Sequence, residues 1–140
     1  MMSFGKKSPK RLTKVNDMST EIMDAFKKVV DKEILNAAYA PLASYIEDNF
    51  TRIDLTYNSN IVENVDQATL LDFEFIRVDD INQDDDILIF QVVVSAEIEI
   101  EETIRRDREV DCVHKWFVLT CSAEVDDISN SFTVKSIRVY

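Results

Sequence analysis

The stretch that decides the fold spans residues 87–125 and reads ILIFQVVVSAEIEIEETIRRDREVDCVHKWFVLTCSAEV. In its first arm the even positions are apolar, and in its second arm the odd positions take over. Period-two alternation places one side of each arm on a buried face, so the stretch predicts one long antiparallel hairpin. The apolar positions are Leu88, Phe90, Val92, Val94, Ala96, Ile98, Ile100, Val113, Phe117, Leu119, Cys121, Ala123 and Val125.

The register of this hairpin depends on where its turn lies. The charged run at residues 105–108 predicts a turn centred between Arg106 and Asp107, which sets Phe90 opposite Ala123. The same register leaves Lys115 opposite Ile98 on the buried face. A β-bulge near 114–116 would remove that conflict, so it stays open which of His114, Lys115 and Trp116 points inward.

The segments around the hairpin complete an α+β chain. Helical spacing of apolar residues begins near Asp17, and Pro41 predicts a break near Ala40 because proline disrupts a helix interior. We therefore predict N-terminal helices packed on one face of a curved, cone-like antiparallel sheet of four to five strands. Before the hairpin we also expect a helix over 41–50, a short strand over 53–57, a helix or loop over 61–68, a strand over 71–78 and an acidic loop over 79–86. After the hairpin we expect a loop over 126–131 and a last strand. In that strand Phe132 and Val134 point inward, and a bulge lies at Lys135–Ser136.

Charge divides the chain into two parts. Residues 1–16 carry five basic side chains and no acid, and we expect a flexible basic arm there. Residues 17–140 hold the remaining 11 basic and all 27 acidic side chains, a formal charge of −16 (11 − 27), and we expect them to form a single α+β domain. A body this acidic repels phosphate backbones, which argues against nucleic-acid binding outside the arm.

Several classes of protein do not fit the composition. No apolar run approaches the roughly 18 residues that a membrane span needs, and the start lacks a signal-peptide core. Cys112 and Cys121 lie on one predicted strand, too far apart to bridge, and two free thiols fit a reducing, cytoplasmic location. Gly5 is the sole glycine and His114 the sole histidine, so the chain has no P-loop, no dinucleotide-binding turn and no zinc motif. We expect no cofactor and no metal.

The run at residues 79–86 invites a calcium interpretation. Asp80, Asn82, Asp84 and Asp86 alternate like the first ligands of an EF-hand loop. The sixth position is Asp85 instead of glycine, and the twelfth lacks the bidentate glutamate. We therefore interpret the run as a solvated hairpin connection.

The outward side of the hairpin offers a second candidate site. Glu97 and Glu99 alternate with buried isoleucines, and the predicted register sets them opposite Trp116 and His114. Carboxylates beside a histidine can serve as general acid and base. With no nucleophile or metal partner in view, a solvated, aggregation-resistant sheet face is the simpler interpretation.

The predicted element order resembles the cone-shaped α+β superfamily of nuclear transport factor 2, ketosteroid isomerases and SnoaL-like proteins. The ending FTVKSIRVY, residues 132–140, looks like the terminal strand of that group. The family contains isomerases, scaffolds and dimerising adaptors, so the resemblance implies a fold and leaves the function open. The isomerase pattern of an Asp base with a Tyr donor cannot be placed on this sequence.

A second resemblance is to the region upstream of ImmA/IrrE-like metallopeptidase domains in Firmicutes. It is carried by RDREVD at 106–111, WFVLTC at 116–121 and SIRVY at 136–140. The HExxH motif of that peptidase is absent, so the resemblance implies an accessory domain of a larger protein. Sequence beyond Tyr140 with an HExxH motif would support it.

Two functions follow as hypotheses. The first is a non-catalytic binding or assembly module, a homodimer that self-associates through a sheet face at Val93, Val118 and Trp116, because the helices can cover only one face. The second is a small-molecule enzyme or ligand pocket inside the cone, with Asp72 or Glu99 as base. The residues expected to line that pocket are Tyr57, Phe73, Phe75, His114 and Trp116.

Overall fold

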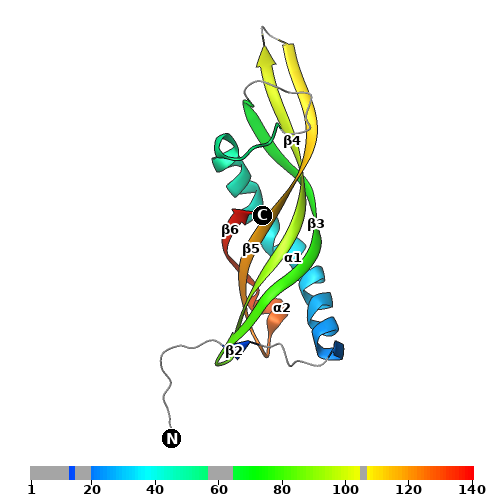
Figure 1. Cartoon of the computed structure of the whole chain (residues 1–140), viewed down its shortest axis with the longest axis vertical. Helices are drawn as coiled ribbons and strands as arrows, with labels where there is room; N and C mark the ends of the chain where they lie inside the picture. Colours follow the sequence, from blue (N-terminus) through cyan, green and yellow to red (C-terminus); the bar gives the residue numbers. More distant parts are fainter. Residues whose placement is uncertain (1–12, 15–19, 57–64, 105–106) are drawn as a thin grey trace, which may run out of the picture.

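The computed structural model describes residues 13–14, 20–56, 65–104 and 107–140. One long helix lies against a five-stranded antiparallel sheet whose strands follow one another in chain order (Figure 1). The elements are β2 (Thr13–Lys14), α1 (Thr20–Asn49), the 3₁₀ helix η1 (Phe50–Arg52), β3 (Gln67–Asp84), β4 (Ile87–Ile104), β5 (Asp107–Glu124), α2 (Ile128–Ser131) and β6 (Thr133–Val139). The predicted α+β class, with helical structure on one face of a curved antiparallel sheet, is confirmed, and the sheet is not closed.

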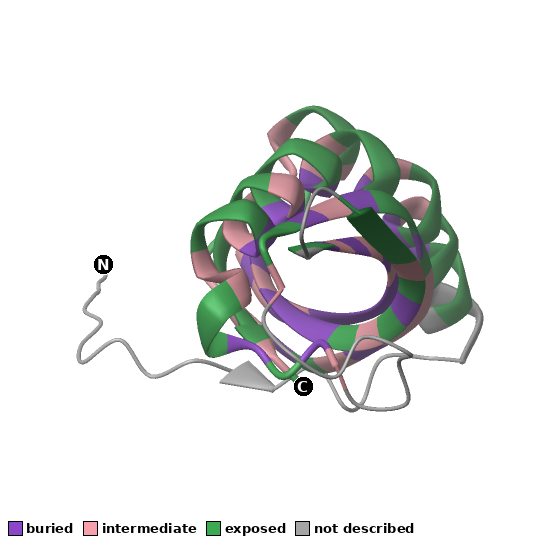
Figure 2. Cartoon of the chain, turned by 90° about the horizontal axis from the view of Figure 1, so that it is seen from above, coloured by how far each residue is buried: buried purple, intermediate pink, exposed green. Residues whose placement is uncertain are grey.

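The core lies between α1 and the sheet. The predicted inward positions of β4, from Leu88 to Ile100, are at most 4% exposed. Phe90 lies at the centre, with its ring edge-on to Phe26 of α1 at 5.1 Å and to Phe132 at 5.5 Å. Viewed along the long axis, buried stretches follow the sheet, whereas the turns of α1 are mainly exposed (Figure 2). The hairpin alternation therefore identified the buried face correctly; of the apolar positions it picked out, Val125 is exposed.

The predicted register of the β4–β5 hairpin is wrong by two residues. Ile104 pairs with Asp107 and Phe90 with Cys121, and residues 105–106 between them lie outside the described residues. An even shift preserves the face of every side chain and changes only its cross-strand partner. The register is continuous along both strands, so there is no bulge near 114–116, and of the three residues left open Lys115 faces inward. Lys115 stays on the helix side opposite Ala96, half-buried, where its long stem can carry the charge outward.

Most of the predicted acidic loop belongs to strand β3. Its pairing with β4 continues to Asp84 opposite Ile87, and only Asp85 and Asp86 form the turn. Asp85 has a φ of 56°, a left-handed conformation that aspartate tolerates better than most residues. Three register shifts, at Leu70/Asp72, Phe75/Arg77 and Asp79/Asn82, bend the strand. The sequence signals for a loop were thus overridden by backbone pairing with β4.

The helical segment differs from the prediction at Pro41. α1 continues through Pro41 to Asn49, so the expected break and separate second helix are wrong. Pro41 lies on the exposed side, where water can satisfy the carbonyl that loses its partner. Residues 53–56 form no strand, although Ile53 and Leu55 are buried, and the predictions at Asp17, Tyr57 and 61–64 lie outside the described residues.

Replacing this helical proline gives a first test of the fold. Pro41→Ala is expected to raise the free energy of unfolding by about 1–2 kcal/mol, because it restores a backbone donor and removes a steric clash within α1. Ser44→Ala, also exposed in α1, is the matched control and should gain about 0.5 kcal/mol or less. Urea unfolding measures both, and no gain over the control would contradict a continuous helix.

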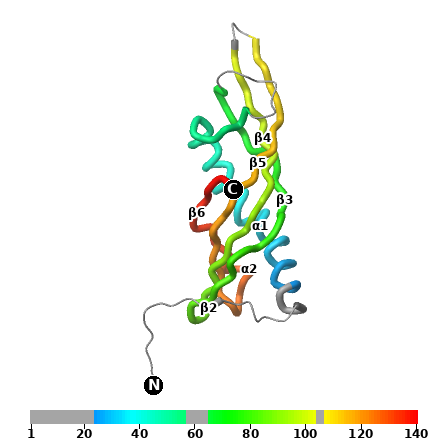
Figure 3. Tube along the Cα trace, in the orientation of Figure 1, coloured from blue at the N-terminus to red at the C-terminus, as the bar shows by residue number. Residues whose placement is uncertain are grey.

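The end of the chain covers only part of β5. As predicted, Phe132 and Val134 pack on the core, and Lys135 is the extra residue between the pairs Cys121–Val134 and Thr120–Ser136. The expected loop contains the short helix α2. β6 pairs with Phe117–Ser122, and the tip of the β4–β5 hairpin extends well beyond it (Figure 3).

Candidate functional site

The face of the sheet that points away from α1 is called the outer face. Directly opposed residues form rows across it, because the β3–β4 and β4–β5 registers are both fixed. Such neighbours on one face lie close enough to interact. Three adjacent rows are Asp72–Glu97–His114, Glu74–Ser95–Trp116 and Arg77–Val93–Val118–Arg138.

An aromatic clasp of Arg77, Trp116 and Tyr140 lies over part of this face. The rings of Trp116 and Tyr140 meet edge-on at 5.2 Å. The Arg77 guanidinium donates to the Tyr140 hydroxyl at 2.7 Å and lies 5.2 Å from the centre of that ring. Hydrogen bonds to Tyr140 and Asp79 raise the pKa of Arg77, so its charge is permanent. Because Arg77 comes from β3 and Tyr140 follows β6, the clasp spans the two central strands.

The three predicted interface residues differ in how far they are exposed within the single chain. Val93 and Val118 are only 1% and 3% exposed within the single chain. Val93 is directly opposite Arg77 and Val118 directly opposite Arg138, so long side chains of the same face shield both. Trp116 remains 38% exposed. Of the three residues, only Trp116 therefore offers a substantial surface to a partner.

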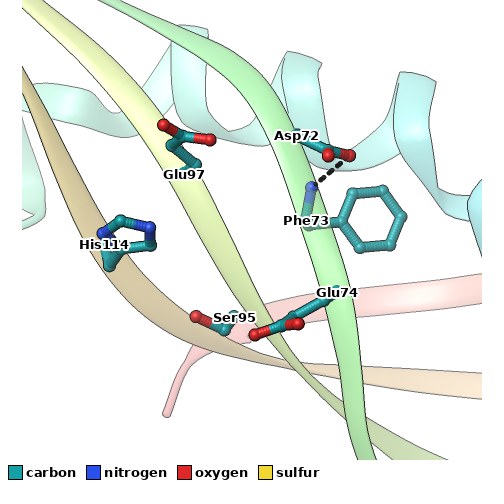
Figure 4. Close-up of a pocket in the computed structure, with 6 residues that line it drawn as sticks. All are labelled: Asp72, Phe73, Glu74, Ser95, Glu97 and His114. Atoms are coloured by element: carbon teal, nitrogen blue, oxygen red, sulfur yellow. Dashed lines mark hydrogen bonds between the residues drawn. The ribbon is translucent and has the colours of Figure 1, made fainter.

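A pocket of about 240 Å³ lies beside the clasp on the outer face (Figure 4). Residues of three strands line it: Asp72, Phe73 and Glu74 of β3, Ser95 and Glu97 of β4, and His114 of β5. Asp72 accepts a hydrogen bond from the Phe73 backbone N–H at 2.8 Å. The pocket thus combines three carboxylates with one imidazole and one hydroxyl.

The acid–base hypothesis changes with the register. His114 lies opposite Glu97, and Glu99 lies opposite Cys112. Among the described residues, no hydrogen bond joins the His114 side chain to Ser95 or to a carboxylate. A nucleophile needs a base within hydrogen-bond reach, and that base needs a group to orient it. The described geometry therefore gives catalysis no assembled constellation to argue from.

The residues expected to line a pocket inside the cone lie in different places. Phe73 is buried and stacks on Tyr39 of α1 at 6.3 Å, and Phe75 packs on the core. His114 and Trp116 are on the outer face, and Tyr57 lies outside the described residues. Only Phe73 and His114 meet at one pocket. Sequence reasoning missed Glu74 and Ser95, which a correct register would have placed beside Trp116.

The second distinctive feature is the free edge, defined as β5 residues 107–115 on the side away from β4. No described strand pairs with it. The Trp116 carbonyl accepts from the Tyr140 N–H at 3.0 Å, so even-numbered residues direct their backbone groups toward this side. Consistent with this, the Cys112 N–H donates to the Asp111 carboxylate at 2.8 Å instead of to a strand.

The opposite edge of the sheet is protected. β3 carries three bulges, its end pairs with β2, and the Tyr39 hydroxyl of α1 donates to the Leu70 carbonyl at 3.0 Å. Bulges and helix cover are two of the devices by which proteins discourage strand addition. The free edge of β5 is unbulged and no described strand or helix covers it, although Asp54 and Leu55 lie beside its end at Val113, His114 and Lys115.

The two cysteines differ in accessibility. Cys112 is exposed beside the free edge, and Cys121 is buried in the core. Burial raises the pKa of Cys121 from 9.0 to about 12, and partial desolvation followed by Glu97 and Glu99 raises that of Cys112. A folded-state pKa above the unfolded value means that the stability from Cys121 is present below about pH 9 and falls as pH rises toward 12.

This difference predicts selective labelling. At pH 8, iodoacetamide is expected to modify Cys112 in the folded protein and Cys121 only after unfolding in urea, because a protonated, buried thiol is inert. Mass spectrometry of the peptides reads out each position. Equal labelling rates for both thiols in the folded protein would contradict the buried position of Cys121.

The acidic run at 79–86 holds no assembled ion site. Its residues now lie along β3 and its turn, where the Asn82 side chain donates to the Asp80 carbonyl at 2.9 Å. Over the described ranges, no group of three or more His, Cys, Asp or Glu side chains is arranged to hold a metal.

Comparisons with known proteins assign this chain to no family. No protein-family model matches the chain, and no curated protein or solved structure is significantly similar to it. Within the described residues, no helix has the length and apolarity to span a membrane. The resemblances stated above therefore stay predictions, and the site is argued from its own geometry.

Proposed function

We propose that this chain is a non-catalytic binding and assembly module that forms a homodimer through its sheet. The second copy joins along the free edge of β5 and contacts Trp116, so that two sheets continue into one. The observation that carries the proposal is the free edge itself, a regular, unbulged run of backbone groups beside an exposed tryptophan. Strand addition satisfies such an edge, and homodimers with two-fold symmetry are the commonest assemblies.

Charge complementarity selects one register for the second copy. In a two-fold antiparallel pair, one residue lies opposite its own copy. Centring on Asp111 opposes two carboxylates, and centring on Val110 opposes Glu109 to Asp111. Centring on Cys112 opposes no like charges and pairs residues 108–116 with their copies.

The Cys112-centred register also makes favourable contacts. It sets Glu109 of each copy opposite Lys115 of the other, twice, and Arg108 beside Trp116. Within one chain Glu109 already lies opposite Glu102. Lys115 of the second copy would therefore offset the repulsion between these two carboxylates. Centring on Val113 avoids like charges too, but it pairs only residues 110–116 because β6 occupies β5 from Phe117 onward.

Sedimentation velocity over a range of protein concentrations tests the proposal. The expected result is a reversible dimer. Trp116→Ala should weaken it about tenfold or more, since exposed aromatic side chains at an interface commonly contribute above 1 kcal/mol. Leu35→Ala, an exposed apolar residue of α1, is the matched control and should leave the dimer unchanged. A strict monomer at all concentrations would reject self-association.

A further inference from the structure

The outer-face pocket contains a polar group that the chain itself leaves unsatisfied. Ser95 is only 9% exposed, lines the pocket, and its hydroxyl has no hydrogen-bond partner among the described residues. Buried polar side chains nearly always have a partner, from the protein, from water or from a ligand. The Ser95 side chain lies next to the Glu74 carboxylate, and its hydroxyl points away from that carboxylate, toward the His114 side of the pocket (Figure 4).

The charges around Ser95 specify what such a partner would be. Asp72, Glu74 and Glu97 come from two adjacent strands and all line this pocket, with the Glu74 carboxylate next to Ser95 and the carboxylates of Asp72 and Glu97 directed away from it (Figure 4). No lysine or arginine is among the described residues that line the pocket. The nearby Arg77 is already bound to Asp79 at 3.0 Å and to Tyr140. The pocket is therefore a concentration of negative charge without an internal cation.

The volume of the pocket and its number of hydrogen-bond acceptors indicate which kind of cation it would bind. A volume of about 240 Å³ is below the usual range for drug-sized ligands, and it suits one small organic group. Three carboxylates and a hydroxyl offer more acceptors than the three donors of an ammonium can use, whereas a guanidinium presents five donors in a planar fork. Trp116 lies directly opposite Ser95 on the neighbouring strand, and guanidinium groups stack on aromatic rings of this kind.

We infer that this pocket binds a guanidinium group, carried either by a small molecule or by an arginine side chain of a peptide. Asp72, Glu74 and Glu97 supply the counter-charge, and Ser95 accepts one N–H. The binding is non-covalent and requires no proton transfer. The site goes beyond dimerisation, because the pocket lies within one chain and is complete without a second copy.

Trp116, the sole tryptophan, supplies a built-in probe for the test. We would titrate the full chain at pH 8 with agmatine, with an end-capped arginine peptide, and with n-butylamine and butylurea as cationic and neutral controls. The expected result is a saturable change in Trp116 fluorescence, together with shifts of the Ser95 and Glu97 amide signals in NMR spectra. Agmatine should bind at least about tenfold more tightly than n-butylamine. Binding of the peptide but not agmatine would support the site and identify a protein partner as its source.

Substitutions in the pocket test whether agmatine binds there. Glu97→Gln and Ser95→Ala should each weaken binding, about tenfold or more for the loss of the charge. Glu124→Gln, the same change at the far end of the outer face, is the matched control and should bind normally. Unchanged binding in Glu97→Gln, or equal effects of agmatine and n-butylamine, would overturn the inference. A monomeric variant that still binds agmatine would separate this site from the proposed dimer.

Discussion

Phe90→Ala is expected to lower the free energy of unfolding by about 3–5 kcal/mol, the usual cost of removing a fully buried aromatic side chain. Phe90 is 0% exposed and joins three parts of the chain through ring contacts with Phe26 and Phe132. Each such aromatic pair adds about 0.5–1.5 kcal/mol beyond the burial of area. A loss of this size would remove much of the 5–15 kcal/mol that typically separates folded from unfolded domains.

Urea unfolding followed by circular dichroism measures this effect. Leu35→Ala on the exposed side of α1 is the control and should cost less than about 1 kcal/mol. If Phe90→Ala cost no more than that control, α1 and residue 132 would not converge on the centre of the sheet, and the described core would be wrong.

Val110→Pro is expected to abolish the dimer while leaving the monomer folded. Val110 is an even-numbered, exposed residue of the free edge, so its N–H points away from β4 and proline is tolerated there. In the Cys112-centred dimer this N–H donates to the second copy, and two-fold symmetry removes the bond twice. Two bonds of about 1–1.5 kcal/mol each predict a loss of affinity of about 100-fold, before any clash of the proline ring.

Two control variants distinguish the loss of the Val110 N–H from other effects of the substitution. Val110→Ala keeps the N–H and should keep the dimer. Val113→Pro removes a donor that points toward β4 and should unfold the hairpin. Sedimentation gives the dimer affinity and circular dichroism the folded state. A folded Val110→Pro variant that still dimerises with native affinity would show that the free edge is not the interface.

The sequence was most informative where a simple periodicity governs the structure. Alternation in β4 identified the inward-facing buried side chains from Phe90 to Ile100, although it missed Val93, which is buried on the outer face, and the change of pattern after Val134 predicted the bulge at Lys135. These features follow from burial of one sheet face, which leaves a direct mark on the spacing of apolar residues.

Features set by tertiary context could not be derived in this way. A two-residue shift of the pairing register preserves the face of every side chain, so the alternation could not reveal that His114 lies opposite Glu97. Pro41 is accommodated because it faces solvent, and the acidic residues 79–84 are held in β3 by pairing with β4. Ser95 follows a run of valines and carries no signal in the sequence; only the pairing of β3 with β4 brings Asp72 and Glu74 to the same pocket as Ser95 and Glu97.

The central claim, that two copies pair along the free edge centred on Cys112, can be tested by one oxidation experiment. In that register each Cys112 lies opposite its copy, with Cα atoms about 5.5 Å apart, which is within the range that a disulfide spans. Cys121 is buried and cannot compete. Mild oxidation of the native dimer should produce covalent dimers in high yield, reversed by reductant and lost in Cys112→Ser and in Val110→Pro. A dimer by sedimentation that forms no Cys112 disulfide would contradict this register.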